Sequence, residues 1–226
     1  MACDDPVVES LESEPFHKGG LGKPVKIAAL CCTYFRPHVL AEAVESFIRQ
    51  DYPAADRELI ILDDAGQLQD GQSIAPNIHV ISHKRRYRTL GEKRNANAAL
   101  ASLNADIYCP WDDDDIHLPW HMSQIAAAMQ DAEWARPNRV LFKRGQHDPR
   151  VINTPGMHHS AWAFSAELFR RAGGYPWIQS GQDQGLATRF KNLGVKSVNP
   201  LAADGANPSY IYRWYASPGV DHLSAH

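Results

Sequence analysis

Long apolar runs are missing from this sequence. No stretch of about 18 consecutive apolar residues exists, which is the length that a membrane-spanning helix needs. The first residues, MACDD, are acidic and lack the apolar core of a secretory signal. We therefore expect a cytoplasmic protein without a transmembrane segment, and attachment to a membrane surface stays compatible with this expectation.

An excess of basic residues is also absent. The 23 lysines and arginines are outnumbered by 26 aspartates and glutamates, so the net charge is -3. A domain that binds nucleic acid usually carries a strongly basic surface. We therefore expect no nucleic-acid partner, while the sequence indicates no particular oligomeric state.

Cysteine is scarce. The four cysteines form no C-x-x-C pair, which argues against a zinc knuckle and against a thioredoxin-type redox site. Three of them lie in apolar runs, where buried free thiols in a reducing compartment are expected. The cysteines are Cys3, Cys31, Cys32 and Cys109.

Apolar runs alternate with helical patterns in the first half of the chain. The runs, which have the length of buried strands, cover residues 25–32, 58–62, 78–82 and 106–111. The helical patterns cover residues 37–50 and 91–103. This alternation predicts an α/β fold with a Rossmann-like, mostly parallel sheet flanked by helices. Ligands of such sheets bind at the carboxyl ends of the strands.

The second half of the chain has a different pattern, with short strands and short helices. It predicts a smaller mixed sheet, with strands at residues 140–144, 150–153, 160–164 and 210–215 and helices at residues 165–172 and 182–193. We interpret the polar, glycine-rich residues 1–24 as a flexible N-terminal arm. Residues 25–226 are then a single domain.

The run of four aspartates at residues 112–115 follows an apolar strand pattern directly. Adjacent carboxylates repel each other unless a cation holds them, and Mg²⁺ is usually shared between one or two carboxylates and the phosphates of a substrate. The alternative is a solvated turn, since charge runs usually lie on exposed surfaces. The polar strand ends at residues 33–36 and 63–64 should lie at the same edge of the sheet, which favours the metal site.

Six short motifs in order resemble the family 2 glycosyltransferases with the GT-A fold. The resemblance covers residues 25–213, and its strength comes from the order and spacing of the motifs, since each one alone is weak. The motifs are TYFRP at 33–37, ILDD at 61–64, GEKRN at 91–95, DDDDIHLP at 112–119, GGY at 173–175 and GQDQGLATR at 181–189.

This resemblance implies an inverting, metal-dependent, hexosyltransferase-like enzyme. Residues 25–119 would bind the nucleotide sugar, with a UDP-sugar favoured, and residues 120–226 would bind a carbohydrate or lipid-linked acceptor. Mg²⁺ or Mn²⁺ would be held by Asp112, Asp114 and His222. The nucleotide sugar would be bound by Thr33, Tyr34, Arg36, Asp63, Arg94, Asp112 and Asp113.

The resemblance assigns the catalytic base to Asp183, which would take the proton of the acceptor hydroxyl. A carboxylate that only supports the start of a helix is the competing interpretation. The chain departs from the family pattern at Gln182, where a glutamate is usual, and this puts the acceptor type in doubt. The acceptor would be bound by His159, Trp162 and Gln182.

Several residues also have structural interpretations. Asp113 and Asp115 could only orient the neighbouring aspartates or cap the next helix, and Asp63 could be an ordinary turn aspartate. We expect His117 and His121 to be a surface pair, because no H-E-x-x-H motif accompanies them.

Two other functions remain open at this point. One is a nucleotidyltransferase on a similar sheet, although its usual glycine-rich loop is replaced here by TYFR at residues 33–36. The other is an inactive protein that only binds nucleotide sugars, for which Gln182 is the one supporting feature.

Overall fold

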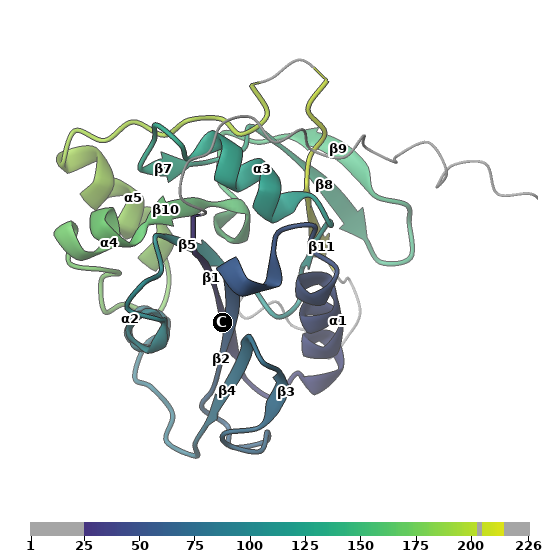
Figure 1. The fold of residues 1–226 in the computed structure, drawn as a ribbon, viewed down its shortest axis with the longest axis vertical. Coiled ribbons are helices and arrows are strands. Elements are labelled where there is room, and N and C mark those ends of the chain that lie inside the picture. Colours follow the sequence, from purple (N-terminus) through teal and green to yellow (C-terminus); the bar gives the residue numbers. More distant parts are fainter. Residues whose placement is uncertain (1–24, 203–204, 215–226) are drawn as a thin grey trace, which may run out of the picture.

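The larger of two sheets forms the frame of the protein. The structure, a computed structural model, describes residues 25–202 and 205–214. Seven strands lie in the order β3-β4-β2-β1-β5-β10-β7 (Figure 1). Their bounds are β1 (Ile27–Thr33), β2 (Arg57–Asp63), β3 (Ser73–Ala75), β4 (Ile78–Ser82), β5 (Ile107–Pro110), β7 (Trp134–Ala135) and β10 (Ala163–Ser165).

The centre of this sheet is parallel. Strand β1 pairs with β2 and β5, and β2 pairs with β4, all in the parallel sense, while β3, β10 and β7 add antiparallel edges. The carboxyl ends of β1, β2, β4 and β5 therefore meet at one edge. The chain segments that follow β1, β2 and β5 are the polar and acidic segments that were predicted to lie at one edge of the sheet.

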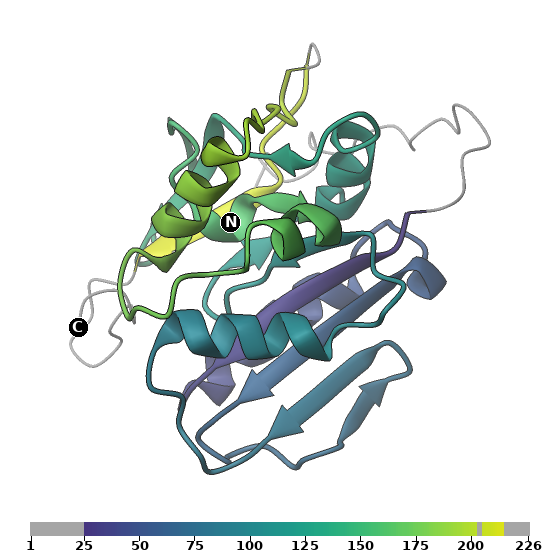
Figure 2. The same ribbon diagram turned by 90° about the vertical axis from the view of Figure 1, so that its left-hand side faces the viewer.

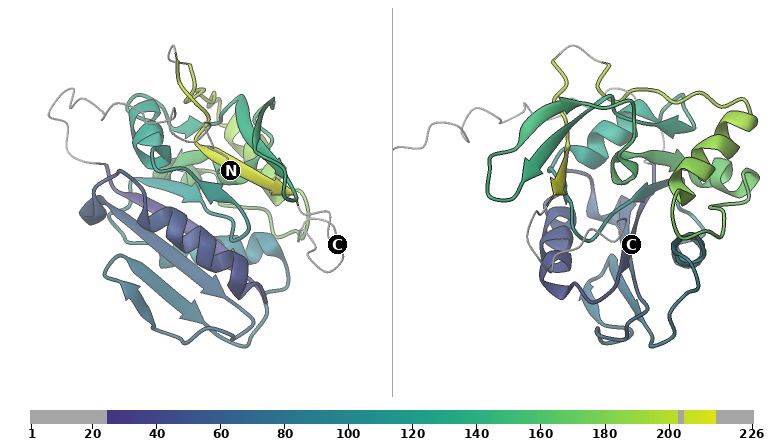
Figure 3. Two further views of the ribbon diagram at one scale, coloured as in Figure 1. Left: turned by 90° about the vertical axis from the view of Figure 1, so that its right-hand side faces the viewer. Right: turned by 180° about the vertical axis from the view of Figure 1, so that it is seen from behind.

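Helices cover both faces of the sheet because its central strands are apolar on both faces. Helix α1 (Pro37–Ile48) packs Leu40 and Phe47 against Ala29 and Ile61 on one face. Helix α2 (Leu90–Leu100) lies on the other face, where Ala98 joins the core. Figure 2 shows α2 in front of the sheet, and the left panel of Figure 3 shows α1 in front of the opposite face.

A second sheet of four strands has the order β6-β11-β8-β9. Strand β11 (Tyr210–Trp214) is the last described element, and it lies between β6 (Ile116–His117) and β8 (Arg139–Arg144). The hairpin of β8 and β9 (Arg150–Asn153) extends outward beside β11 (Figure 1). The helices of this half are α3 (His121–Ala128), α4 (Ala166–Arg171) and α5 (Gln182–Asn192), and the short 3-10 helices of the chain are η2 (Ala54–Asp56) and η3 (His159–Ala161).

The predicted fold class is confirmed, and most of the predicted strands and helices have counterparts in the structure. The strand predicted at residues 160–164 is corrected, because η3 occupies His159–Ala161 and the strand that follows it, β10, belongs to the larger sheet. Sequence reasoning missed only short strands, namely β3, β6 and β7, which are too short to show a period. Cys31, Cys32 and Cys109 are free, and burial raises the pKa of the Cys109 thiol to about 12. The proposed arm 1–24, with Cys3, lies outside the described residues. No helix in the described part has both the length and the apolar composition to cross a bilayer.

A cluster of buried rings lies next to the acidic run. Its two histidines, His117 and His121, were expected to lie on the surface, and this expectation is corrected. His117 and His121 are each 1% exposed, so they are not a surface pair. The ring of His117 stacks on Trp111 with 3.7 Å between centroids, and its Nε2 donates to the Ser160 carbonyl at 2.9 Å. His121 Nδ1 lies 2.9 Å from the Ser209 hydroxyl. Burial lowers the pKa of His117 to about 3 and the pKa of His121 well below its ordinary value.

This cluster predicts a loss of stability in mild acid. An unfolded histidine takes up a proton near pH 6.5, whereas buried His117 stays neutral down to about pH 3, so unfolding binds a proton between these values. The free energy of unfolding therefore falls as the pH falls through this window. At pH 5 the share of His117 is about 2 kcal/mol.

Urea unfolding at pH 7.5 and pH 5 measures this effect. His117→Gln keeps a donor for the Ser160 carbonyl, and we expect its stability difference between the two pH values to be smaller by about 2 kcal/mol. The same change at exposed His38 is the control. An unchanged pH dependence in His117→Gln would contradict the prediction.

Candidate active site

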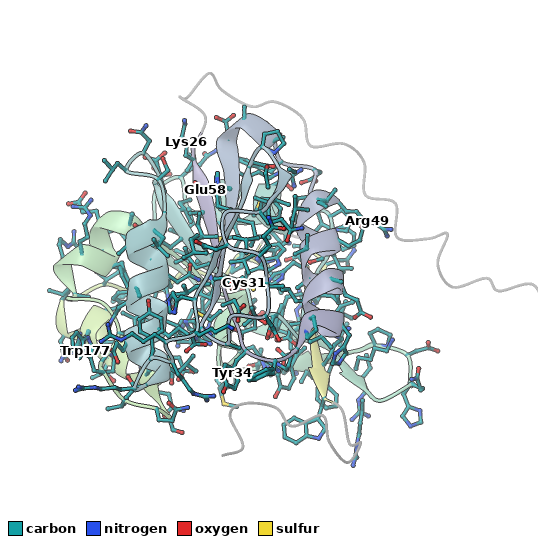
Figure 4. All side chains as sticks on the ribbon, turned by 90° about the horizontal axis from the view of Figure 1, so that it is seen from below. Lys26, Cys31, Tyr34, Arg49, Glu58 and Trp177 are labelled. Carbon is teal, nitrogen blue, oxygen red and sulfur yellow. The ribbon has the colours of Figure 1, made fainter. Side chains whose placement is uncertain are left out.

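A cleft of about 400 Å³ opens where the parallel strands end. Figure 4 marks this edge with Tyr34, which follows β1, while Lys26 and Glu58 label the opposite edge. The cleft receives side chains from the segments after β1 and β5, from α2, from the start of α5 and from β11. These include Arg36, Arg94, Asp112, Asp113, Asp114, His158, His159, Gln182, Asp183, Tyr210 and Tyr212.

The first aspartates of the acidic run are held by two arginines. Asp112, which is half-buried, accepts from Nη2 of Arg94 at 3.0 Å. Arg36 bridges the next two carboxylates: its Nη1 donates to Asp114 at 2.5 Å and its Nη2 donates to Asp113. Burial raises the pKa of Asp113 to about 7, and Arg36 opposes this shift. All three aspartates line the cleft, and Asp112 and Asp114 expose more of their side chains to it (30% and 9%) than Asp113 does (1%).

Asp115 has a structural role. Its carboxylate is 1% exposed and accepts from the Tyr210 hydroxyl at 2.5 Å and from the Arg213 backbone N–H at 2.8 Å. Burial and the charge of Asp114 raise the pKa of Asp115 well above its ordinary value. The sequence could not distinguish the four aspartates, whereas the structure gives each a different environment.

The aspartates that end β2 are used by the fold, which corrects the prediction for Asp63. Asp63 is fully buried, and it accepts from the N–H groups of Ala65, Gln67 and Leu68 and from the Ser82 hydroxyl. Burial favours its protonated form, yet the hydrogen bonds from Leu68 and Ala65 lower the pKa of Asp63 below its ordinary value. These contacts match the turn aspartate that was the alternative interpretation of Asp63.

The neighbouring Asp64 forms a buried ion pair. Lys93 Nζ donates to Asp64 at 2.5 Å and to the Thr33 carbonyl at 2.6 Å. Thr33 is therefore a buried anchor for Lys93, and its side chain does not line the cleft. Tyr34 is half-buried, and the Arg86 guanidinium lies 3.7 Å above its ring. The structure thus covers one face of the ring that was expected to stack on a base.

Asp183 lies in the first turn of α5 and faces the cleft. Among the described residues, no hydrogen-bond donor or cation holds its carboxylate. Its charge is close enough to Arg94 to favour the guanidinium form of that arginine. Gln182 lines the same wall and is 6% exposed. A carboxylate with this position can accept a proton from a ligand in the cleft.

The predicted acceptor residues have different places. His159 lines the cleft, held between Arg94 and the Tyr175 hydroxyl, whose oxygen is 2.9 Å from Nε2. Trp162 does not line the cleft and is 2% exposed. It packs on Trp134, and its Nε1 donates to the Gly156 carbonyl at 2.9 Å. The prediction of an acceptor face on Trp162 is therefore corrected, because its ring belongs to the core.

The structure adds cleft residues that sequence reasoning missed. They are Tyr210 and Tyr212 of β11, which line it together with His158, the neighbour of His159. The pattern YIYRW was read as a strand, and its alternation of residue types could have placed both tyrosines on one face. Their proximity to the acidic run, which lies about a hundred residues earlier, has no signal in the sequence.

The cleft offers carboxylate oxygens that could bind a divalent cation, but the described residues provide too few of them to surround the cation alone. No group of three metal-binding side chains occurs within residues 25–202 and 205–214. Asp112 and Asp114 remain as the pair that faces the cleft, and His222 lies outside the described residues. One or two carboxylates together with substrate phosphates are the usual environment of Mg²⁺. The donor set therefore fits a cation that is shared with a phosphorylated ligand.

Comparison with known proteins identifies similar sequences and folds. The sequence model described as Glycosyl transferase family 2 matches residues 29–173. No curated protein matches the sequence. Residues 1–349 of S. aureus TarS, in complex with UDP-GlcNAc, are 16% identical with a TM-score of 0.67, covering 89% of this chain and 61% of that chain.

A second similar structure is that of a mannosyltransferase. The mannosyltransferase PcManGT from Pyrobaculum calidifontis, in complex with GDP-Man and Mn²⁺, is 16% identical with a TM-score of 0.59, covering 90% of this chain and 62% of that chain. The present chain thus spans about three fifths of the length of both structures. At this identity the likeness shows a shared fold.

The unequal environments of the aspartates predict unequal effects on stability. Asp115→Ala leaves the Tyr210 hydroxyl and the Arg213 N–H buried without an acceptor, and we expect it to lower the free energy of unfolding by about 2–3 kcal/mol. Asp112→Ala removes a partly exposed ion pair, in which the Asp112 side chain is 30% exposed, and should cost less, about 1 kcal/mol. Urea denaturation of both variants measures this. Equal losses would contradict the division of roles.

Proposed function

The chain belongs to glycosyl transferase family 2 and has the GT-A type of α/β fold. We propose that it transfers a sugar from a nucleoside diphosphate sugar to an acceptor hydroxyl. We favour a UDP-sugar as donor and a carbohydrate or lipid-linked molecule as acceptor. One observation carries the proposal: the carboxylates of Asp112 and Asp114 and the free carboxylate of Asp183 line a single cleft.

The donor end of the cleft would be the acidic run. Asp112 and Asp114 are the residues that would hold Mg²⁺ or Mn²⁺ together with the donor phosphates. The cation would stabilise the negative charge that develops on the diphosphate as the glycosidic bond breaks. The pairing of Arg36 with Asp113 and Asp114 supports this assignment, because these carboxylates already attract positive charge to this end of the cleft.

Two guanidinium groups would bind the diphosphate itself. Arg36 and Arg94 both line the cleft, and each already holds a carboxylate of the acidic run. An arginine offers paired N–H donors that match phosphate oxygens. Phosphate oxygens of the donor would take over part of these contacts. Arg94 would also be positioned by His159, which is fixed by Tyr175.

Asp183 would act as the general base. The acceptor hydroxyl oxygen would attack the anomeric carbon, its proton would pass to the Asp183 carboxylate, and the bond to the diphosphate would break in the same step. Attack opposite the leaving group inverts the anomeric centre. The free state of the carboxylate supports this role, because a base must have a lone pair that no protein donor occupies.

Gln182 would orient the acceptor without titrating. Its side chain is buried beside the base and faces the cleft. An amide offers both donors and an acceptor, so it can bind a hydroxyl in either direction. The loss of the usual glutamate would then change acceptor recognition and leave the proton transfer to Asp183.

Binding of the donor is the first test. UDP with Mn²⁺ or Mg²⁺ should raise the melting temperature, by several degrees at about a hundredfold excess over Kd. GDP and dTDP in the same screen show which nucleobase the donor site prefers. Asp114→Asn should abolish the metal-dependent part of the shift, while the same change at exposed Asp131 should leave it intact. A protein that no nucleoside diphosphate stabilises would refute the proposed donor site.

Turnover is the second test. Asp183→Asn should reduce the release of UDP from a UDP-sugar about a hundredfold or more, since general-base catalysis contributes that much. The thermal shift with UDP and Mn²⁺ should remain, because the substitution leaves the acidic run untouched. Asp131→Asn again serves as the control. If the unmutated protein binds the donor but turns over no acceptor, the protein is a binding protein and the proposed reaction is wrong.

A further inference from the structure

A second hollow, of about 380 Å³, lies beside the β8–β9 hairpin. It is lined by Phe142, Arg144, His147, Asp148 and Arg150. We propose that this hollow is an acceptor subsite that binds an anionic group, a phosphate or a carboxylate, on the acceptor carbohydrate. The proposal rests on the transferase function proposed above, and it names the chemical class of the acceptor.

The strand register gathers the two arginines on one face. Successive side chains of a strand alternate between faces, so Phe142 and Arg144 share a face of β8 while Lys143 points to the other. Arg150 of β9 is the direct partner of Phe142 across the hairpin, so it lies on the same face. A guanidinium on each strand and an aromatic ring between them therefore surround the hollow.

The charge of the hollow is positive in a chain of net charge -3. Within the described part of the chain, Arg144 and Arg150 have no carboxylate within ion-pair distance. Arg94 and Arg213 each have one, and Arg36 has two. Asp148 contributes one negative charge to the lining, and His147 adds a group that can become positive. Two unpaired guanidinium groups in one hollow match an oxyanion, which they can bind by paired N–H donors.

A strip of aromatic rings connects the hollow to the cleft. Tyr212 lines the cleft, and its ring lies 5.9 Å from that of Phe142, which lines the hollow. His158 lies 4.5 Å from Tyr212 on the cleft side. Trp214, the register partner of Arg144, is 6.4 Å from Tyr212 and 40% exposed.

Aromatic faces pack well against the C–H surfaces of sugar rings. A carbohydrate lying on this strip would reach the cleft of Asp183 with one end and the two arginines with the other. The chemistry of the strip and of the hollow thus indicates the same ligand, a sugar that carries a negative group.

Three matched hexoses test the subsite. Glucose, glucuronate and glucose 6-phosphate differ only in the group at C6, which is a hydroxyl, a carboxylate or a phosphate. We would titrate each into the full chain with UDP and Mg²⁺ present, so that the donor phosphate site is filled, and follow binding by saturation-transfer NMR. We expect the two anionic sugars to bind about tenfold or more tightly than glucose, and the stronger of them identifies the preferred anion.

Two variants make the result specific. Arg144→Gln with Arg150→Gln should reduce the affinity for the anionic sugars to that for glucose and leave the affinity for glucose unchanged. Lys143→Gln removes the same charge from the opposite face of β8 and should change neither. Both arginines are exposed, so the double variant should keep its melting temperature. Equal binding of the three sugars, or an unchanged affinity in the double variant, overturns the proposal.

Failure of the proposed function gives a different result. If UDP does not bind to the unmutated chain, the donor site is wrong, while the sugar titrations still report on the hollow. A lipid surface is the other source of anionic groups, and vesicles of phosphatidylcholine with phosphatidylglycerol test it by sedimentation. If the double variant loses only vesicle binding and keeps its affinity for glucose 6-phosphate, the arginines serve membrane contact and the subsite proposal is wrong.

Discussion

The repulsion among four consecutive carboxylates is the constraint on which the site depends. A strand that ends in residues 112–115 can fold only if the protein brings positive groups or hydrogen-bond donors to each carboxylate. Arg94 comes from α2, Arg36 from the turn before α1, and the donors to Asp115 from β11. Three separate parts of the chain thus converge on one strand end, and the cleft is the space that they leave between them.

Strand β11 contacts both the acidic run and the β8–β9 hairpin. Tyr210 donates a hydrogen bond to Asp115, the last residue of the acidic run. Tyr212, two residues later, lines the cleft and contacts Phe142 of the hairpin. Alternation along a single strand puts both tyrosines on one face. One face of β11 therefore connects the acidic run, through Tyr210, with the hairpin that carries Arg144 and Arg150.

The parts of the structure that local pattern determines could be predicted from the sequence. Continuous apolar runs gave the central strands, and their carboxyl ends correctly brought Arg36, Arg94 and the acidic run to one edge. Burial could not be predicted, because it depends on distant neighbours. His117 is buried by Trp111 and Tyr210, Trp162 by Trp134, and Asp63 is closed off by its own turn.

The insertion of β11 also fixes the order in which the site can form during synthesis. The partners of Asp115 lie 95 and 98 residues further along the chain. A nascent chain that has exposed the parallel strands β1, β2, β4 and β5 still lacks Tyr210 and Arg213, which come about a hundred residues after β5. The acidic strand end must therefore wait, solvated and incompletely paired, until residues 210–213 have been synthesised and have left the ribosome. Contacts of such long sequence separation are slow to close, so this edge should be the last part of the protein to become ordered.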